Sequence, residues 1–491
     1  MGIELLPSYV GGKIITDQDN PDRTAEIKSL DGSFTSTVVA TSTSQIRNAI
    51  RAADDYQKKL NSTPMEERIA VAEMLVKEYA KHKWTVARGL GLFRGQVAKD
   101  SFWMCDLISQ WGSELDTFLS TIFGNVSDLS VPVTSSIASY GQVVWQSRGT
   151  AAMYCAASMD GPPNITALCH GIISGTHMII RPSWRDTVTH LAFDILYKHG
   201  LHEYAQLVRW PSSAEEGNQN NKQLLNNVSQ GLIFSSDETY AHLINSAAPE
   251  GSEAWRGLTR KCRRYGTGLP INIVTEASDL EATAGDLVAG ARLGCGRFCL
   301  STTPVLVQQN IYKDLVEAVV SVAKSLRPGS ILDPKTDLCG YDPSELQSVT
   351  NALKLFGGDL KHGEVRGENT DVFVLENVSA QSPCLYAEIG APVLGFIPYR
   401  DLTEAIRIAN VALTRNQRDA WTAMSVHGNY DNFTTLRSAI PNFRALLGGV
   451  VAEGKLLLPH QGTYFVLDLM RRTTIEDVVA THSTRPLKKT S

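Results

Sequence analysis

Apolar residues recur at intervals of three or four along the first quarter of the chain, and this is the spacing of amphipathic helices. The pattern runs from Ser44 to about Trp111, and Ile46 and Ile50 are among its first members. Residues 9–40, which precede it, contain short runs separated by Gly-containing turns and predict strands. The chain therefore opens with short strands and continues with several helices.

Beyond residue 140 short apolar runs and helical stretches follow one another. An apolar run at Thr150–Ala157 leads into a Gly/Pro turn, a helix to about Ser174 and a strand at His177–Arg181. A strand, a helix and a second strand in this order form a βαβ unit, which implies a parallel sheet covered by helices. Ligands of such sheets bind beyond the carboxyl ends of the strands, so Ser158 and Arg181 lie at plausible site positions.

The alternation continues through most of the remaining chain. It predicts strands at 205–211, 231–235, 271–275, 304–307 and 371–375, and helices at 220–228, 279–293, 308–324 and 401–410. Strands that alternate with helices in this way are typical of α/β proteins. At 491 residues the chain is long enough for two or three such domains.

Cys299 lies between the helix that ends near residue 293 and the strand at 304–307. A thiol held at such a joint can be exposed and have its thiolate form favoured, as a nucleophile requires. The alternative is a small buried hydrophobe, which is the expected role of the other cysteines, at positions 105, 155, 169, 262, 295, 339 and 384. These residues form no CxxC pair, so neither a zinc site nor a disulfide framework is indicated.

Charge and hydropathy exclude some classes of function. The formal net charge is −5 with both signs interspersed, which argues against a nucleic-acid-binding protein. The only basic run, at 485–489, is expected to be a solvated tail. The N-terminus lacks a secretory signal and no apolar stretch is long enough to span a bilayer, so we expect a cytoplasmic protein.

The sequence Gly296-Arg297-Phe298-Cys299 resembles the Gly-Gln-x-Cys nucleophile turn of the aldehyde dehydrogenase superfamily. Cys299-Leu300-Ser301 is similar to the Cys-Leu-Ser of the fatty-acyl-CoA reductases of bacterial bioluminescence, a branch of that superfamily. The resemblance implies an α/β fold with two doubly wound parallel-sheet domains and a small β arm for oligomerisation. It also implies that Cys299 is the catalytic nucleophile.

A second resemblance lies at Arg181-Pro-Ser183-Trp-Arg185-Asp186, which is similar to the Lys-Pro-Ser of aldehyde dehydrogenases and to the Lys-Pro-Ser-Ser-Arg-Asp of the reductases. The family lysine meets the adenosine ribose, which implies that Arg181 and Ser183 bind the cofactor. Since a guanidinium binds phosphate in a forked geometry, Arg181 favours NADP(H) over NAD(H). For Arg185 a surface ion pair with Asp186 or a neighbour is an equal alternative.

The stretch Ser235-Ser-Asp-Glu-Thr239 is similar to the Gly-Ser-Asp-Glu-Thr turn of the reductases, which lies beside the cofactor pyrophosphate in the superfamily. This resemblance implies cofactor-binding roles for Ser235 and Ser236. Ser236 or Asp237 can cap the helix that follows. A hydroxyl-capped helix N-terminus is an anion site in principle, and an ordinary capping box is the alternative.

Near residue 388 the stretch Tyr386-Ala-Glu388-Ile-Gly-Ala-Pro392-Val-Leu394 resembles the Glu-Ile-Phe-Gly-Pro-Val-Leu of aldehyde dehydrogenases. The family glutamate accepts hydrogen bonds from the nicotinamide ribose, and the resemblance assigns this role to Glu388. Gly390 replaces the aromatic residue that packs beside the nicotinamide.

Two further family positions differ here. Aligned on Pro270, Arg264 replaces the glutamate that activates water, and an arginine cannot accept a proton near neutral pH. CoA-dependent members also lack this glutamate, so Arg264 is expected to bind substrate at a CoA or phosphopantetheine phosphate, with a surface salt bridge as the alternative. For the oxyanion-hole asparagine, Ser158 fits on spacing and Asp160 fits by comparison with the reductases. A serine can donate a hydrogen bond to an oxyanion, whereas an ionised aspartate cannot.

The resemblance divides the chain into three parts. Residues 1–127 and 146–255 form the expected dinucleotide-binding domain, 256–454 the catalytic domain, and 128–145 with 455–491 the oligomerisation arm and tail. The implied assembly is a homodimer or homotetramer.

The predicted activity is NAD(P)H-dependent reduction of an acyl thioester, carried by CoA or an acyl carrier protein, to an aldehyde, or the reverse reaction, through a thioester on Cys299. One alternative is oxidation of an aldehyde to a carboxylic acid with NAD(P). Another is a degenerate family member that acts in acyl transfer or structurally, without hydride transfer.

Overall fold

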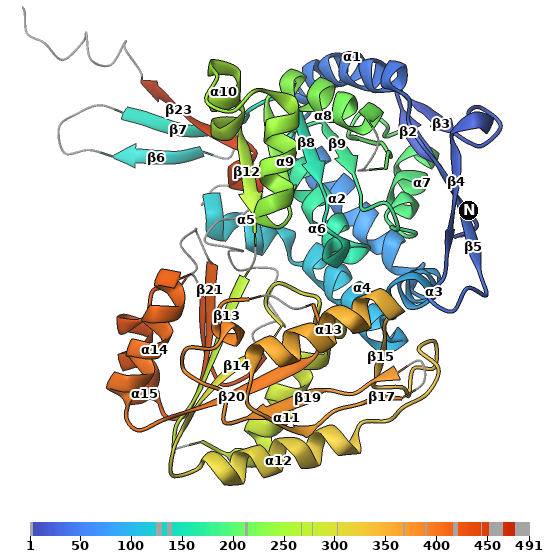
Figure 1. Ribbon diagram of the computed structural model, residues 1–491. Helices are drawn as coiled ribbons and strands as arrows, with labels where there is room; N and C mark the ends of the chain where they lie inside the picture. The colour runs from blue at the N-terminus through green and yellow to red at the C-terminus, as the bar shows by residue number, and fades with distance from the viewer. Residues whose placement is uncertain are drawn as a thin grey trace, which may run out of the picture.

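A computed structural model describes residues 3–123, 130–134, 140–211, 215–266, 268–276, 278–301, 303–366, 369–387, 390–415, 421–442, 444–450 and 465–476. Two lobes, each built on a seven-stranded sheet, lie against one another, and a three-stranded arm projects from the first lobe (Figure 1). The α/β class with two largely parallel sheets and a small β sheet, expected from the sequence, is confirmed.

The first sheet has the strand order β12 (Cys262–Tyr265), β11 (Gln230–Phe234), β8 (Ala151–Tyr154), β9 (Met178–Arg181), β10 (Ala205–Leu207), β2 (Ser8–Val10) and β3 (Lys13–Ile15). Its first five strands are parallel, and β2 and β3 continue it antiparallel. Successive residues of β8 alternate between two apolar cores, because Met153 packs in one and Tyr154 in the other. Such a strand is buried on both faces, as its uninterrupted apolar sequence predicts.

Helices cover both faces of this sheet. One core contains α2 (Met65–Ala80), α3 (Lys83–Arg94), α4 (Ala98–Ser113), α5 (Leu115–Phe123), α6 (Pro162–Ser174) and α7 (His190–Lys198). The other contains α1 (Thr43–Leu60), α8 (Glu215–Asn227), α9 (Asp237–Ala247) and α10 (Glu253–Lys261). A capping box of Ser42 and Gln45 begins α1, which explains why the helical pattern starts at this point in the sequence.

The second sheet has the order β16 (Asp359–His362), β19 (Phe373–Glu376), β20 (Val393–Tyr399), β14 (Pro304–Gln308), β13 (Gly268–Val274), β21 (Trp421–His427) and β22 (Arg444–Leu447). Only β16 runs antiparallel to its neighbour among these strands. The core on one face includes α11 (Leu280–Arg292) and α12 (Tyr312–Ser325), and the core on the other includes α13 (Pro343–Phe356), α14 (Leu402–Arg415) and α15 (Tyr430–Ala439).

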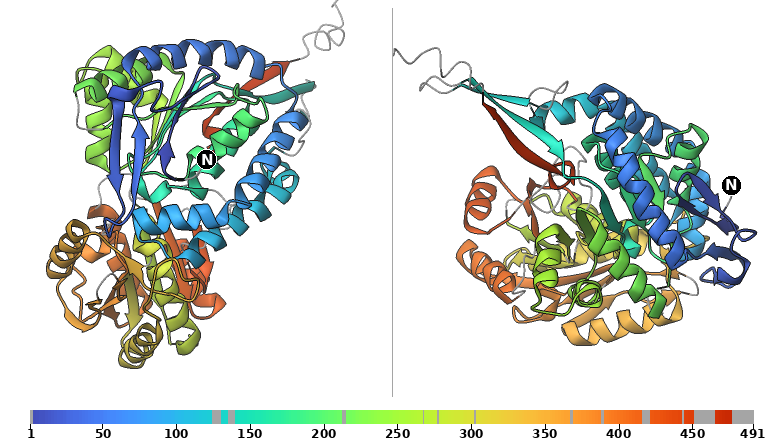
Figure 2. Two further views of the ribbon diagram at one scale, coloured as in Figure 1. Left: turned by 90° about the vertical axis from the view of Figure 1, so that its right-hand side faces the viewer. Right: turned by 90° about the horizontal axis from the view of Figure 1, so that it is seen from above.

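The arm pairs segments that are far apart in the sequence. Its order is β23 (Met470–Glu476), β7 (Tyr140–Ser147) and β6 (Ser130–Thr134), all antiparallel, and it extends away from both lobes (Figure 2). Two further small sheets have the orders β1 (Leu5–Leu6), β5 (Thr35–Val39), β4 (Thr24–Lys28) and β15 (Cys339–Gly340), β18 (Asn369–Thr370), β17 (Val365–Arg366). The short helices are η1 (Pro21–Arg23), η2 (Ala157–Met159), η3 (Leu293–Gly296), η4 (Pro383–Leu385) and α16 (Phe465–Asp468).

The boundary expected at residue 256 is wrong by about ten residues. Strand β12 pairs with β11, so it belongs to the first sheet, and the chain enters the second sheet with β13 at Gly268. Tyr265 is buried in the first core and its ring stacks on Phe234 with centroids 4.6 Å apart. Across the described ranges, every helix is too short or too polar to cross a membrane.

Candidate functional site

Cys299 lies on the turn between η3 and β14, where the two lobes meet. The carbonyl of Cys299 packs so closely on the first residue of β13 that a Cβ added to Gly268 would lie 2.1 Å from its oxygen. Phe298, one residue earlier, packs against the core of the first lobe, whereas Cys299 packs against the small cluster that contains Ala423 of the second. The turn that carries the thiol is therefore held by both lobes.

The thiol of Cys299 is half-buried, and the other seven cysteines are buried. Burial raises the pKa of Cys105 to about 12, that of Cys262 to about 11 and that of Cys384 to about 12. These three thiols are protonated near neutral pH and cannot act as thiolate nucleophiles. Exposure thus separates Cys299 from the rest, as the sequence predicts.

Arg297 fixes the turn from inside the joint. Its Nη1 donates to the carbonyl of Arg94 at 2.6 Å, and its Nη2 donates to the carbonyl of Gly340 at 3.3 Å and to Glu345 Oε2 at 2.9 Å. The guanidinium also lies 4.1 Å from the ring centroid of Tyr341, within cation–π range. These contacts use the planar fork of an arginine, whereas the family turn has a glutamine here.

Two glycines let the backbones approach at this joint. A Cβ at Gly296 would lie 2.3 Å from the carbonyl carbon of Ala391, and a Cβ at Gly95 would lie 2.0 Å from the carbonyl oxygen of Gly340. Both glycines have positive φ, of 66° and 63°. A larger residue would thus meet a steric clash as well as an unfavourable backbone conformation.

The turn that should supply the oxyanion donor begins with η2. Ser158 is half-buried there, and Asp160 follows in a buried position. Arg94 Nε donates to Asp160 Oδ2 at 2.6 Å, and Ser183 Oγ donates to Asp160 Oδ1 at 2.9 Å. Because the oxygens of Asp160 accept these bonds, Asp160 is not an oxyanion donor, and Ser158 is the better candidate of the two.

Burial raises the pKa of Asp160 to about 7, against the lowering effect of Arg94. The hydroxyl of Ser183 is expected to bind the cofactor, but it is engaged in this network and also accepts from Arg94 Nη2 at 2.5 Å. The structure thus joins Asp160 and Ser183 through Arg94, which nothing in the sequence pattern singles out.

Arg181 is enclosed by its own lobe. Its Nη2 donates to the carbonyl of Trp210 at 3.0 Å, and its guanidinium lies over the rings of Tyr154 and Trp210 at 5.8 and 5.3 Å. The side chain is only 9% exposed. The guanidinium is therefore less available to a cofactor phosphate than the sequence suggests.

The residues expected around the pyrophosphate gather at the N-terminus of α9. Ser236 caps the helix by accepting from the amide of Thr239 at 3.3 Å, and Ser235 Oγ donates to the carbonyl of Ser236 at 3.1 Å. Arg264 lies on the neighbouring strand β12 and forms an ion pair with Asp237 in the first turn. The predicted cap is confirmed, and Arg264 makes the salt bridge that was its alternative.

The remaining expectations have different outcomes. Arg185 forms an ion pair with Asp342 of the second lobe at 3.5 Å, rather than with Asp186. Asp186 is buried and accepts from the amides of Val188 and Thr189. Glu388 lies outside the described residues.

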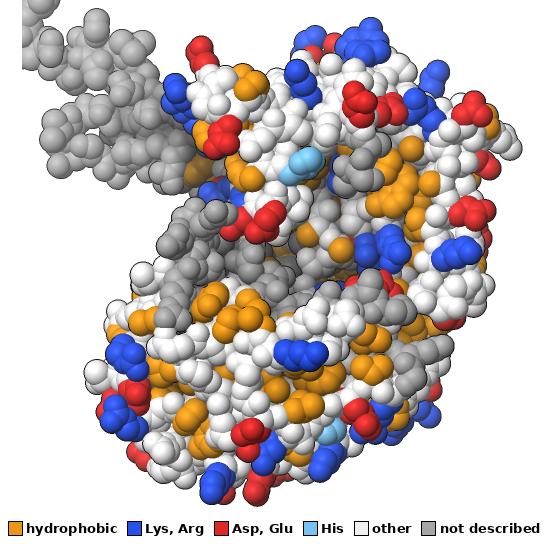
Figure 3. Space-filling view, in the orientation of Figure 1, with side chains coloured by type: hydrophobic (Ala, Val, Ile, Leu, Met, Phe, Trp, Pro, Cys, Tyr) orange, Lys and Arg blue, Asp and Glu red, His pale blue; other side chains and the backbone are white. Residues whose placement is uncertain are grey.

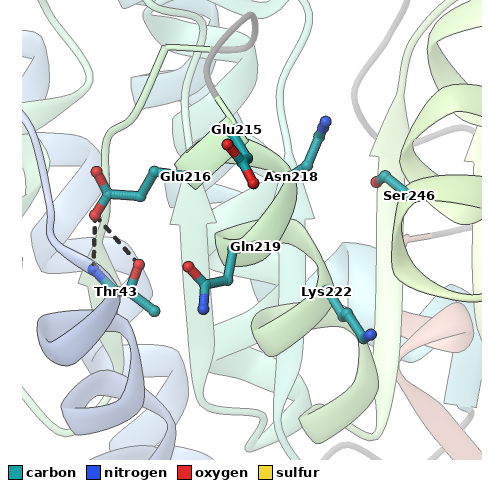
Figure 4. A pocket seen from close by; sticks show the side chains of 7 residues that line it. All are labelled: Thr43, Glu215, Glu216, Asn218, Gln219, Lys222 and Ser246. Atoms are coloured by element: carbon teal, nitrogen blue, oxygen red, sulfur yellow. Dashed lines mark hydrogen bonds between the residues drawn. The ribbon is translucent and has the colours of Figure 1, made fainter.

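A polar pocket of about 600 Å³ opens between the start of α1 and helices α8 and α9 (Figure 4). It is lined by Thr43, Glu215, Glu216, Asn218, Gln219, Lys222 and Ser246. Glu216 accepts from the amide and hydroxyl of Thr43, both at 3.2 Å, and pairs with Arg23 at 2.9 Å. Glu215, by contrast, is exposed in the first turn of α8.

This face of the molecule carries both signs of charge and is hollowed between the two lobes (Figure 3). In the part of the chain that the structure describes, no group of three or more His, Cys, Asp or Glu residues is placed to hold a metal ion.

Comparison with known proteins agrees with the fold. A sequence model of the Aldehyde dehydrogenase family matches residues 15–427. A lactaldehyde dehydrogenase of Methanococcus maripaludis strain C5 is 26% identical over 213 residues, which are 41% of this chain and 45% of that protein. A malonate-semialdehyde dehydrogenase of Listeria monocytogenes strain HCC23 is 30% identical over 149 residues, 28% of this chain and 30% of that protein. The matches thus span less than half the length of these curated relatives.

Solved structures match over nearly the whole chain. An NAD-dependent aldehyde dehydrogenase from Sinorhizobium meliloti has a TM-score of 0.81 at 17% identity and covers 99% of this chain and 96% of that one. A betaine aldehyde dehydrogenase mutant from Staphylococcus aureus, solved in complex with NAD+, has a TM-score of 0.80 at 15% identity and covers 99% of both chains. At these identities the likeness concerns the fold.

Proposed function

The chain belongs to the aldehyde dehydrogenase family, and from this premise we propose that it oxidises an aldehyde with a nicotinamide dinucleotide through a covalent intermediate on Cys299. The observation that carries the proposal is the half-buried thiol of Cys299 on a turn held between the two lobes. The names of the curated relatives support oxidation of an aldehyde better than the reduction of an acyl thioester that the sequence predicts first.

The first step is attack by the Cys299 thiolate on the aldehyde carbon. A carbon–sulfur bond forms, the π electron pair moves to the oxygen, and the Ser158 hydroxyl donates to the resulting oxyanion. The C=O bond then reforms as the aldehyde hydrogen leaves with its electron pair, and a thioester remains on Cys299. A nicotinamide dinucleotide, when bound, supplies the acceptor for that hydride.

The fate of the thioester depends on what attacks it next. Arg264 stands where a water-activating glutamate is expected, and it is paired with Asp237 on the first lobe. We therefore propose transfer to a thiol, either of CoA or of phosphopantetheine on an acyl carrier protein. The incoming thiolate attacks the thioester carbon, and the bond to Cys299 breaks with return of the electron pair to its sulfur. The reverse sequence reduces an acyl thioester to an aldehyde.

The second candidate is hydrolysis of the thioester to a carboxylic acid. The observation that favours it is that the curated relatives are named as aldehyde dehydrogenases without mention of CoA. This candidate needs another residue to activate water, because Arg264 cannot do so.

The polar pocket beside α8 and α9 supports binding of the adenosine end of the cofactor, because the first turn of α8, which lines it, follows the carboxyl end of β10. A carboxylate such as that of Glu215 can accept hydrogen bonds from ribose hydroxyls but repels a 2′-phosphate. Since Arg181 is also enclosed, the geometry supports NAD(H) better than the NADP(H) expected from the sequence.

The projecting β arm supports assembly into a homodimer or homotetramer, because its edge strands are open to pairing.

Product analysis separates the candidates. The protein is incubated with a panel of aldehydes and NAD+ or NADP+, with and without CoA, in water enriched in ¹⁸O, and the products are identified by mass spectrometry. Acyl-CoA as the main product supports thiol transfer, whereas ¹⁸O-labelled carboxylic acid supports hydrolysis. Acylation of Cys299 by acyl-CoA without any reduced cofactor formed from aldehydes would support the degenerate acyl-transfer alternative.

A further inference from the structure

Arg94 is the last residue of α3 and lies where the two lobes meet. Its side chain forms a hydrogen-bonded network with those of Asp160 and Ser183. The side chains of Arg94 and Asp160 are 15% and 2% exposed. Salt therefore screens this ion pair much less than it would screen a surface pair. Loss of the guanidinium would leave the carboxylate buried and without its cationic partner.

The backbone around Arg94 is bound to the second lobe. The carbonyl of Arg94 accepts from Arg297, and the carbonyl of Gly95 accepts from the amide of Gly340 at 2.8 Å. The end of α3 is thus fixed to the nucleophile turn by its backbone, whereas its side chain contacts the turn that contains Ser158.

That turn connects β8 to α6 and contains Asp160. It begins with the three-residue helix η2, and the amide of Asp160 makes only a long bond of 3.3 Å to the carbonyl of Ala157. Gly161 follows with φ of 79° and caps α6, where its carbonyl accepts from the amide of Asn164 at 3.0 Å. The side-chain contacts of Asp160 therefore anchor the turn two residues after Ser158.

We propose that Arg94 is a positioning residue whose side chain holds the Ser158–Asp160 turn of the first lobe in register with Cys299 of the second. It acts through Asp160 and does not itself touch the reacting atoms. The inference rests on the proposed function, because it concerns the oxyanion that forms when Cys299 attacks a carbonyl carbon.

The ion pair gives the positioning a pH dependence. The charged and titratable groups that face Asp160 are Arg94 of α3, Tyr79 of α2, Cys155 after β8, Asp186 after β9 and Arg209 after β10. With a pKa of about 7, Asp160 gains a proton as the pH falls below neutrality. The neutral acid binds Arg94 more weakly, so the positioning should weaken on the acid side.

A cofactor-independent probe tests the inference on the full chain. The Cys299 thiolate attacks the carbonyl of p-nitrophenyl acetate, the new carbon–sulfur bond leaves an acetyl thioester, and p-nitrophenolate departs with the electron pair. The burst of p-nitrophenolate therefore reports formation of the oxyanion. Alkylation of Cys299 by iodoacetamide, measured by mass spectrometry, is the companion reaction, because displacement at a saturated carbon forms no oxyanion.

We expect Arg94→Met to slow the burst by about 10- to 100-fold, somewhat less than removal of a direct oxyanion donor. Its half-saturation concentration and the alkylation rate should stay within about twofold, since the thiol itself is unchanged. Arg94→Lys should recover part of the rate. The double variant with Ser158→Ala should be no slower than Ser158→Ala alone, because both changes remove one interaction.

The matched control is Arg185→Met, which removes another arginine that pairs across the two lobes. It should leave the burst unchanged. Because burst and alkylation both need the Cys299 thiolate, their ratio isolates the effect of Asp160. The fall of this ratio on the acid side, with a midpoint near pH 7, should disappear in Asp160→Asn. If Arg94→Met fails to fold, Ser183→Ala and Asp160→Asn test the same network.

The inference is overturned if Arg94→Met keeps the full burst rate, if its effect multiplies with that of Ser158→Ala, or if Ser158→Ala has no effect. It is also overturned if alkylation slows as much as the burst, which would indicate a general loss of structure around Cys299. Failure of the proposed function would give a different result, because Cys299→Ser would then keep both the burst and aldehyde oxidation.

Discussion

Nη1 of Arg297 donates a hydrogen bond of 2.6 Å to the carbonyl oxygen of Arg94, so a residue two positions before Cys299 is tied to the last turn of a helix in the other lobe. The same guanidinium binds Gly340 and Glu345 of its own lobe. The side chain of Arg297 thus fixes the position of the nucleophile turn relative to both lobes. A hydride transfer needs this kind of fixed geometry, because small misplacements of reacting atoms cost large factors in rate.

Replacement of Arg297 by glutamine, the residue of the family turn, should destabilise the protein. Three hydrogen bonds from a cation that is only 12% exposed are lost, and we expect a decrease of about 2–4 kcal/mol in unfolding free energy. Equilibrium urea denaturation measures the change. The matched control, Arg400→Gln, removes an exposed partner of Glu404 and should leave the unfolding free energy nearly unchanged. Equal stabilities of the two variants would contradict the role assigned to Arg297.

Replacement of Cys299 by serine should lower aldehyde-dependent reduction of NAD(P)+ by at least ~10³-fold, because the covalent route is lost. The measurement is the absorbance of the reduced cofactor, together with the mass of the protein after exposure to acyl-CoA. Cys105→Ala, which changes a buried thiol of α4, should retain acylation and activity. Activity in the serine variant at the wild-type level would refute the assigned nucleophile.

Asp160 should make stability depend on pH. Its pKa in the folded state, about 7, lies above the ordinary value of 3.8. Between these values the folded protein keeps a proton that the unfolded chain has lost, so stability falls as pH rises towards 7 and then levels off. Relative to Asp160→Asn, the wild type should lose roughly 1–3 kcal/mol between pH 5 and pH 7. Urea denaturation of both proteins across this range gives the difference, and parallel curves would show that Asp160 does not titrate there.

The acidic wall of the pocket should set the cofactor preference. Wild type is expected to bind NADH more tightly than NADPH, and Glu215→Gln should shift the ratio towards NADPH by roughly fivefold, which is about 1 kcal/mol of relieved repulsion. Quenching of tryptophan fluorescence measures both affinities. Glu253→Gln, an exposed glutamate in the first turn of α10, is the control and should leave the ratio unchanged. A wild-type preference for NADPH would instead support the interpretation based on Arg181.

Local chemistry explains what the sequence could predict. The joint at Cys299 is recognisable because a helical repeat stops and a buried strand begins within a few residues, and α11, η3 and β14 follow this pattern. The cap at Ser236 is similarly local, since the hydroxyl bonds an amide three residues later. Such features depend on neighbours in the chain and can be inferred without knowledge of the packing.

Contacts between distant segments could not be inferred in this way. Arg185 finds Asp342 instead of the adjacent Asp186, because Asp186 is already bound by backbone amides. The sequence places β12 in the second lobe, which is wrong. Its two central arginines make the strand look polar, although Cys262 and Tyr265 on either side of them are buried. No pattern in the sequence singles out Arg94, because its contacts form only when the two lobes meet.

The crowding at Gly95 and Gly296 bears on attempts to redesign this protein by directed evolution. A methyl group at either position would overlap backbone atoms of another segment, 2.0 Å from the oxygen of Gly340 or 2.3 Å from the carbonyl carbon of Ala391. Libraries randomised at these two codons should return glycine almost alone. A change in substrate range would have to come from side chains around the Cys299 sulfur, while the backbone at Gly95 and Gly296 stays unchanged.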